Sequence, residues 1–169
     1  MFLVEEVPLP LSAETAESGM LAHLMLDALD EESNEAFETG RELLVRAGVR
    51  GLSKRVQVQV LPPYRDAGTM VIPVRWVATG PAGGLFPQLD GNLEIVSVSP
   101  TESTLRLVGS YRPPLGEAGA SLDRVALNRV AQATFRSFLR QLRRTLEESA
   151  KTLGPRPDRG DAPNWVDHS

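Results

Sequence analysis

The sequence predicts an α+β fold in which a curved antiparallel sheet wraps around one long C-terminal helix, with two short helices after the first strand. Apolar and polar residues alternate within 2–11 and within 56–111, which is the period of strands that bury one face. Short turns separate the later strands, whereas a parallel return would need a crossover of about a dozen residues. From Ser121 the apolar period becomes that of a helix and persists for about thirty residues, long enough to cover the sheet.

The first strand is expected over residues 2–11. Pro8 and Pro10 lie on the same face of this strand, and they limit it to an edge of the sheet or to an early exit from it, because proline has no N–H for the hydrogen-bond ladder. The opposite face is apolar and carries Leu3, Val7, Leu9 and Leu11.

Two helices are expected next, over 13–30 and 33–47. Ser12 suits the N-cap of the first helix, because its hydroxyl oxygen can accept a hydrogen bond from a backbone N–H of the first turn. Gly48 stands where a glycine commonly ends a helix.

The middle of the chain is predicted to form the rest of the sheet. The expected strands are 56–60, 69–76, 93–98 and 104–111. Residues 62–68 and 80–84 are rich in turn-forming residues and are expected to connect strands. The pair Asp90-Gly91 is a common hairpin-turn sequence and is expected to precede the third of these strands.

The last helix is predicted from Ser121 to a stop at Gly154, with its apolar stripe facing the sheet. Three residues of the predicted stripe are small, namely Ala126, Ala133 and Ser137. Small side chains cannot fill a wide space beneath a concave sheet, which favours a cavity between helix and sheet. A closed core of the same side chains is the alternative.

Length and composition are those of one globular domain. The chain has 169 residues, of which 41% are hydrophobic and 24% charged, and a domain has roughly 150 residues. We expect a domain over 1–153 and a disordered tail over 154–169, where proline, glycine and charged residues prevail.

Several kinds of chemistry are excluded by composition. The chain has no cysteine, which rules out disulfides, thiolate metal sites, iron–sulfur clusters and a cysteine nucleophile. It has two histidines, His23 and His168, too few for a three-histidine metal site. We therefore expect no metal and no cofactor. The net charge of −4 does not favour a nucleic-acid partner.

Charge is distributed unevenly along the chain. Residues 1–40 carry ten acidic and no basic side chains, whereas residues 121–150 carry six arginines. Two solvated helix faces would account for this, and the alternative is that the acidic front attracts the basic helix in the folded protein. The start of the chain lacks the basic region of a signal peptide, and no apolar stretch approaches the roughly 20 residues that cross a bilayer. We expect a cytoplasmic protein without integral membrane association.

The element order and two stretches carry a resemblance to a known superfamily. The stretches run from Arg75 to Pro81 (RWVATGP) and from Tyr111 to Gly116 (YRPPLG), the second leading into the last helix. Over residues 1–150 the chain resembles the helix-grip fold of the Bet v 1/START-like (SRPBCC) superfamily, which includes polyketide cyclases, dehydrases and lipid-transfer domains. It is more similar to bacterial members without an assigned reaction than to any enzyme branch. The resemblance implies a cavity for a hydrophobic ligand and carries over no catalytic residue.

The predicted ligand site lies between the sheet and the last helix, with Arg75 at its rim. Tyr111 and Arg129 are its polar members, and a buried phenol or guanidinium needs a partner. That partner is either a ligand carbonyl or carboxylate, or an acidic residue of the fold. The full predicted lining is Met70, Ile72, Trp76, Leu107, Tyr111, Arg129, Val130, Ala133 and Phe138.

The leading functional hypothesis is binding of a small hydrophobic molecule, such as a lipid or a polyketide, in this cavity. The first alternative is an enzyme of cyclase or dehydrase type that uses Tyr111, Arg129 or a cavity acid. The second is a protein-interaction module without a ligand. A homodimer or another protein partner stays open in all three hypotheses.

Overall fold

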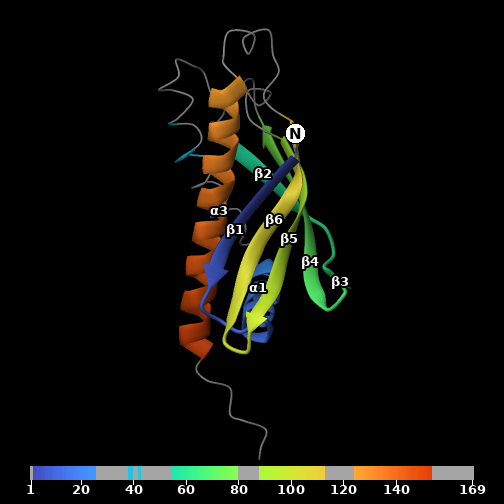
Figure 1. Ribbon diagram of the computed structural model, residues 1–169, viewed down its shortest axis with the longest axis vertical. Helices are drawn as coiled ribbons and strands as arrows, with labels where there is room; N and C mark the ends of the chain where they lie inside the picture. Colours follow the sequence, from blue (N-terminus) through green and yellow to red (C-terminus); the bar gives the residue numbers. More distant parts are fainter. Residues whose placement is uncertain are drawn as a thin grey trace, which may run out of the picture.

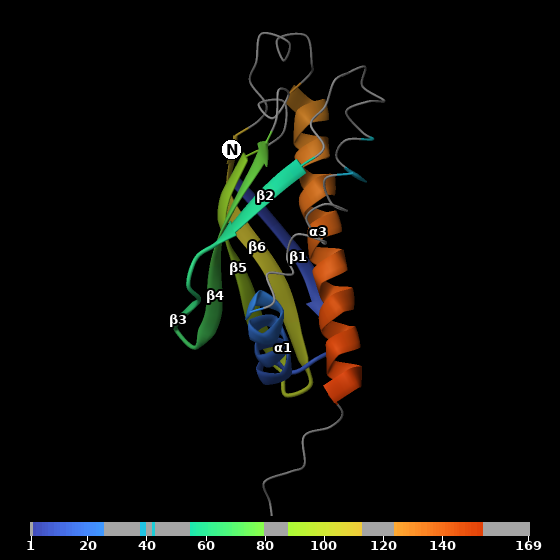
Figure 2. The same ribbon diagram turned by 180° about the vertical axis from the view of Figure 1, so that it is seen from behind.

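An antiparallel sheet curves around the C-terminal helix in the computed structural model of the chain (Figures 1 and 2). The structure describes residues 2–25, 38–39, 42, 55–79, 88–112 and 124–153. The elements in these ranges are β1 (Phe2–Leu9), α1 (Ala13–Met25), β2 (Arg55–Val60), β3 (Tyr64–Asp66), β4 (Thr69–Thr79), β5 (Gln88–Ser99), β6 (Glu102–Arg112) and α3 (Arg124–Leu153).

Within the described ranges, six strands form one sheet in the order β1-β6-β5-β4-β2, and β3 pairs with β4 beside this path. Every pair of neighbouring strands is antiparallel. The predicted fold class is confirmed. Of the second helix expected over 33–47, only residues 38, 39 and 42 are described, and the tail expected over 154–169 lies outside the described residues.

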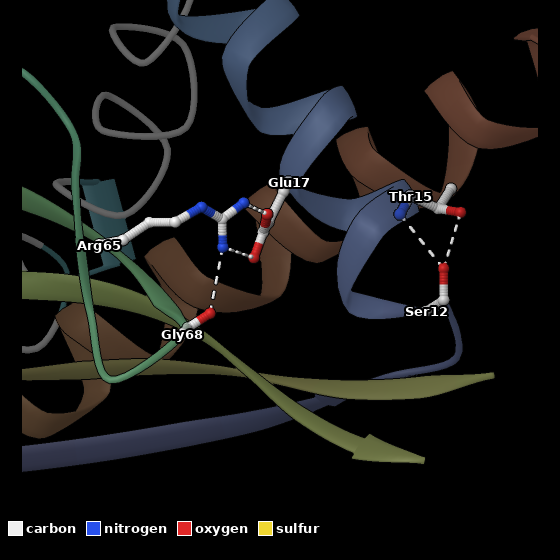
Figure 3. Close-up of polar contacts among 5 residues, drawn as sticks. All are labelled: Ser12, Thr15, Glu17, Arg65 and Gly68. Atoms are coloured by element: carbon white, nitrogen blue, oxygen red, sulfur yellow. Dashed lines mark hydrogen bonds and ion pairs between the residues drawn. The ribbon is translucent and has the colours of Figure 1, made fainter. Parts of the chain in front are cut away.

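The first strand and helix follow the prediction closely. β1 lies at the edge of the sheet and pairs with β6, as the two prolines require. Ser12 caps α1: the Thr15 N–H donates to the Ser12 hydroxyl oxygen at 3.2 Å (Figure 3). The Ala16 N–H donates to the Ser12 carbonyl oxygen at 3.0 Å. α1 lies at the end of the sheet opposite the start of β1 (Figure 1).

The expected turn at Asp90-Gly91 is wrong, because both residues lie inside β5. Gly91 is paired with Gly109 of β6. A Cβ atom on Gly91 would lie 2.6 Å from the Val108 carbonyl oxygen, and one on Gly109 would lie 2.6 Å from the Asp90 carbonyl oxygen. The two strands approach too closely at this point for any side chain, so Gly91 allows this close approach and does not form a hairpin turn.

The segment predicted as a turn over 62–68 contains the short strand β3. A two-residue turn, Ala67-Gly68, connects β3 to β4, and the φ angles of these residues are 47° and 86°. Positive φ at both positions is the geometry of a tight hairpin turn that matches the twist of the strands. The hairpin extends the sheet beside α1 (Figure 2).

The sheet-facing side of α3 agrees with the predicted stripe at Val130, Phe138, Leu142 and Leu146 and differs from it at the small residues. Phe135, Phe138 and Leu142 are buried against the sheet, whereas Ala133 and Ser137 are only half-buried. The series through Ala133 and the series through Phe135 have the helical period equally well, so the period alone does not decide which face is buried. Packing against the sheet buries the side that carries the larger side chains. The large side chains of α3 therefore face the sheet. The small residues therefore do not provide the reason for a cavity between helix and sheet that the sequence suggested.

We predict that Gly109→Ala lowers the free energy of unfolding by about 1–3 kcal/mol or more, because the added methyl group collides with the backbone of β5. The neighbouring exposed residue offers a control, and Ser110→Ala should change it by less than about 0.5 kcal/mol. Urea unfolding of the two variants measures both values. Equal stabilities would show that the two strands are not in close contact at the glycine pair.

Candidate functional site

A cross-strand row of large side chains lies on the inner face of the sheet, at the end opposite α1. Strand register places Val58, Trp76, Leu89 and Tyr111 in one line across β2, β4, β5 and β6. Trp76 is 3% exposed and Tyr111 is 1% exposed. Alternate residues of a strand point to one face, so the buried position of Trp76 confirms the predicted strand parity.

Two phenylalanines of α3 contact the tryptophan of this row. The ring centroid of Trp76 lies 5.7 Å from that of Phe135 and 5.5 Å from that of Phe138. The ring planes are nearly perpendicular, at 89° and 87°, which is the edge-to-face geometry that aromatic quadrupoles favour. Because α3 approaches β1 and β6 most closely, these rings connect the helix to the more distant strand β4.

The structure brings together seven of the nine predicted lining residues. These seven are buried in one apolar core: Met70, Ile72, Trp76, Leu107, Tyr111, Val130 and Phe138. Ala133 is half-buried and Arg129 is exposed. Arg129 therefore does not join the other predicted residues in the core.

The predicted residues occupy more than one level of the inner face. Ile72 and Leu107 are both paired with Leu93, in a row nearer to α1 than the Trp76 row. The prediction missed Leu89 and Phe135. With Trp76, Tyr111 and Phe138 they form the end of the inner face opposite α1, called here the aromatic end. Phe135 stands three residues before Phe138, a spacing that places both on one helix face and that was available in the sequence.

Tyr111 is the titratable residue of the aromatic end. Burial raises the pKa of its phenol above the ordinary value of 10.0, because desolvation disfavours the charged phenolate. The hydroxyl group therefore stays protonated and neutral at ordinary pH. It is suited to donate a hydrogen bond and is poorly suited to act as a base.

The two buried acidic residues of the described chain are both ion-paired. Glu5 points from β1 toward α3, where Arg136 donates to its carboxylate from Nε at 2.9 Å and from Nη2 at 3.2 Å. Glu17 of α1 is paired with Arg65 of β3. The Glu5 pair joins the first strand to the last helix, a contact of the kind that the alternative interpretation of the charge distribution, an acidic front attracted to the basic helix, expects.

A groove of about 410 Å³ lies on the other face of the sheet. Phe2, Leu61 and Pro73 line it, and Phe2 is 71% exposed. Arg75, which was expected at the rim of the inner cavity, lies in this outer groove and donates from Nε to Asp90 at 2.5 Å. Its position follows from strand parity, because Arg75 is adjacent to the inward-facing Trp76.

No three His, Asp or Glu side chains of the described ranges gather closely enough to hold a metal ion. Among the helices in these ranges, none combines the length and the apolar character that a membrane span requires.

We predict that the phenol of Tyr111 ionises at higher pH in the folded chain than in the unfolded chain. The chain has two tyrosines, so Tyr64→Phe leaves the tyrosinate absorbance to Tyr111 alone. Below the unfolded pKa both states are protonated, and stability is unaffected. As pH rises past 10.0 the unfolded state ionises first, so the free energy of unfolding should fall until the folded pKa is passed.

The measurement is an ultraviolet pH titration of the Tyr64→Phe variant with and without urea. Urea-unfolding curves above pH 10, compared with those of Tyr64→Phe/Tyr111→Phe, give the stability effect. Identical native and unfolded titration curves would show that Tyr111 is solvated.

Comparison with known proteins finds likeness in structure and not in sequence. The chain matches no family model, and no curated protein matches it. TTHA0849 from Thermus thermophilus is 15% identical with a TM-score of 0.52, over 89% of this chain and 99% of that one. A conserved protein from Geobacillus kaustophilus is 11% identical with a TM-score of 0.55, over 88% of this chain and 97% of that one.

A third solved structure is more distant. The Zhui aromatase/cyclase from Streptomyces sp. R1128 is 11% identical, covers 91% of this chain and 96% of its own, and has a TM-score of 0.40, too low to support an argument. The first two likenesses extend over nearly the whole of each chain and show a shared fold. Together with the curved sheet and its long final helix, they confirm the helix-grip fold that the resemblance to the Bet v 1/START-like superfamily implied.

Proposed function

We propose that the chain binds a small apolar molecule between the inner face of the sheet and α3, at the end lined by Trp76, Leu89, Tyr111 and Val130. The observation that carries the proposal is the aromatic contact across this end. Edge-to-face rings, and not close backbone packing, connect β4 to α3. Rings that meet by their edges can separate and rotate to admit another flat or branched apolar group.

The chemistry of the lining favours an uncharged ligand. Apolar burial contributes about 25 cal/mol per Å² before the cost of ordering the ligand and the side chains. The buried carboxylates Glu5 and Glu17 already have arginine partners. The neutral hydroxyl group of Tyr111 is the group of this lining best suited to orient a carbonyl or hydroxyl of the ligand.

The packed state of the lining sets the expected affinity. Trp76 contacts both Phe135 and Phe138 in the unliganded chain. An entering ligand replaces ring–ring contacts with ring–ligand contacts, so the net gain comes from the ligand surface newly removed from water. Dissociation constants should therefore lie in the micromolar range, about −8 kcal/mol.

Binding is favoured over a cyclase- or dehydrase-type reaction in the same space. General acid–base catalysis needs two polar groups that converge on the reacting atoms. Arg129, the second polar residue predicted for the site, is exposed on α3. Tyr111 alone, with its raised pKa, can polarise a carbonyl but cannot also accept a proton.

We predict saturable binding of the neutral dye N-phenyl-1-naphthylamine with quenching of Trp76. In a Trp165→Phe background the chain has one tryptophan, Trp76. A dye bound at the aromatic end accepts its excitation energy, so tryptophan emission should fall as dye emission rises, with a stoichiometry of about one. Displacement by a panel of neutral lipids and polycyclic aromatics then ranks ligands.

The outer groove supplies the control. Phe2→Ser/Leu61→Ser removes apolar side chains from that groove and should leave dye affinity unchanged. Loss of binding in this variant would place the dye outside the sheet, and absence of saturable binding to the native chain would exclude the proposed function.

A further inference from the structure

A small groove lies where the end of β1 and the β5–β6 hairpin meet the second half of α3. Pro8, Pro10, Val98 and Arg143 line it, and it is called here the proline groove. Its volume is about 200 Å³, whereas sites for whole small molecules have about 300–1,000 Å³. The proline groove therefore suits one large side chain better than a complete ligand.

The apolar wall of the proline groove is open to water. Pro8 and Pro10 are exposed, and Val98 is 62% exposed. Because Pro8 alternates with the buried residues Val7 and Leu9, the groove opens away from the inner face of the sheet. It is thus separate from the proposed ligand site.

A β-bulge presents Val98 at this wall. Ser97 is paired with Ser103 and Ser99 with Glu102, so Val98 is the extra residue between two cross-strand pairs. A bulge interrupts the regular alternation of a strand and changes the direction of a side chain. The valine is therefore directed to the surface by the backbone of the hairpin, at a point where it adds apolar area beside the two prolines.

The opposite wall is an arginine held in place by a neighbour. Arg143 of α3 donates from Nε to the Glu147 carboxylate at 2.5 Å. A guanidinium group attracts the face of an aromatic ring, and proline rings pack against aromatic rings where proline-rich segments are recognised. The combination of prolines, a valine and an arginine favours an aromatic occupant over an aliphatic or a charged one.

The chain carries one such side chain beyond α3. Trp165 is the one Trp, Tyr or Phe within residues 154–169, and Val166 follows it. The rest of this segment is mainly proline, glycine and charged or small polar residues, which offer an indole little to pack against. Tryptophan joins a large apolar surface to one N–H donor, the combination typical of residues at interfaces.

The length of the segment allows Trp165 to reach the proline groove. Arg143 precedes Leu153, the last residue of α3, by ten residues, which is about 15 Å along a helix. Twelve residues lead from Leu153 to Trp165, and they span up to about 40 Å when extended. The end of α3 and the β5–β6 hairpin lie at the same end of the molecule (Figure 1), so the segment needs less than half of its reach.

We infer that the C-terminal segment turns back along α3 and that Trp165 occupies the proline groove. The indole packs against Pro8, Pro10 and Val98, with the Arg143 guanidinium at its face. Glu102 and Thr104 of the same lining offer oxygen acceptors for the indole N–H. The inference does not depend on the proposed function, because this groove lies outside the inner face.

Attachment to α3 favours this occupant over a free partner. One side chain in a groove of this size gives weak binding between separate molecules. A short flexible connection raises the effective concentration of the tethered group to about the millimolar range, far above the concentration of a second copy in dilute solution. The same segment of a second copy is the competing occupant, and concentration separates the two.

The test is ¹⁹F NMR of the full chain labelled with 5-fluorotryptophan. The chain has two tryptophans, Trp76 and Trp165, and Trp165→Phe assigns their resonances. We expect the Trp165 resonance of the native chain to differ from its position in urea and to show a reduced shift between H₂O and D₂O. The buried Trp76 serves as an internal reference for folding.

Two matched variants locate the docked indole. Val98→Asp places a charge in the proline groove and should lower the docking equilibrium constant about tenfold, as for loss of an apolar contact. Val4→Asp makes the same substitution at an exposed valine of β1 outside the groove and should leave the Trp165 resonance unchanged. Where Val98→Asp also moves the Trp76 resonance, Arg143→Ala replaces it, with Arg144→Ala on the same helix as its control.

Three results would overturn the inference. A Trp165 resonance at its urea position in the native chain would show that the indole is solvated. A protected Trp165 that responds neither to Val98→Asp nor to Arg143→Ala would place it outside the proline groove. A return toward the urea position on about tenfold dilution would assign the groove to the segment of a second copy.

Discussion

The contact of Trp76 with two phenylalanines of α3 closes the concave face of the sheet, and the other features of the fold are arranged around it. A sheet that buries one face needs a cover, and α3 approaches it most closely at β1 and β6. Aromatic side chains bridge the remaining distance to β4. The pairing of Gly91 with Gly109 lets the strands approach closely between these two sides, and Glu5–Arg136 fixes the helix along the edge strand.

This arrangement divides the inner face into two ends with different physical character. At one end α1 covers the sheet with the small and flexible apolar side chains of Ala16 and Met20, and Glu17 of this helix is paired with Arg65 of β3. At the other end rings meet edge to face beside a buried, neutral phenol. The packed rings favour apolar recognition.

The strands could be predicted from short stretches of sequence, because inward-facing and outward-facing residues alternate along a strand. Trp76 was placed on the inner face because it shares its parity with Met70, Ile72 and Val74 and alternates with Arg75. The edge position of β1 followed from Pro8, since its missing N–H needs no knowledge of the fold. The core of the candidate site was predictable for the same reason.

Features set by distant residues were not predictable in this way. Gly91 matched a turn sequence, and only its partner across the sheet, Gly109, shows why it belongs in a strand. The face of α3 depends on how the helix meets the sheet, so Phe135 was missed and Arg129 was misplaced at the inner face. The pair Glu17–Arg65 joins residues 48 positions apart and has no local signature.

A double-mutant cycle between Trp76 and Phe138 tests most directly whether this aromatic contact holds the sheet on the helix. Urea unfolding of the native chain, Trp76→Leu, Phe138→Leu and the double variant yields the coupling free energy. We expect a favourable coupling of about 0.5–1.5 kcal/mol, the range found for edge-to-face aromatic pairs. Strictly additive losses would contradict a direct contact between the rings and with it the proposed position of the ligand site.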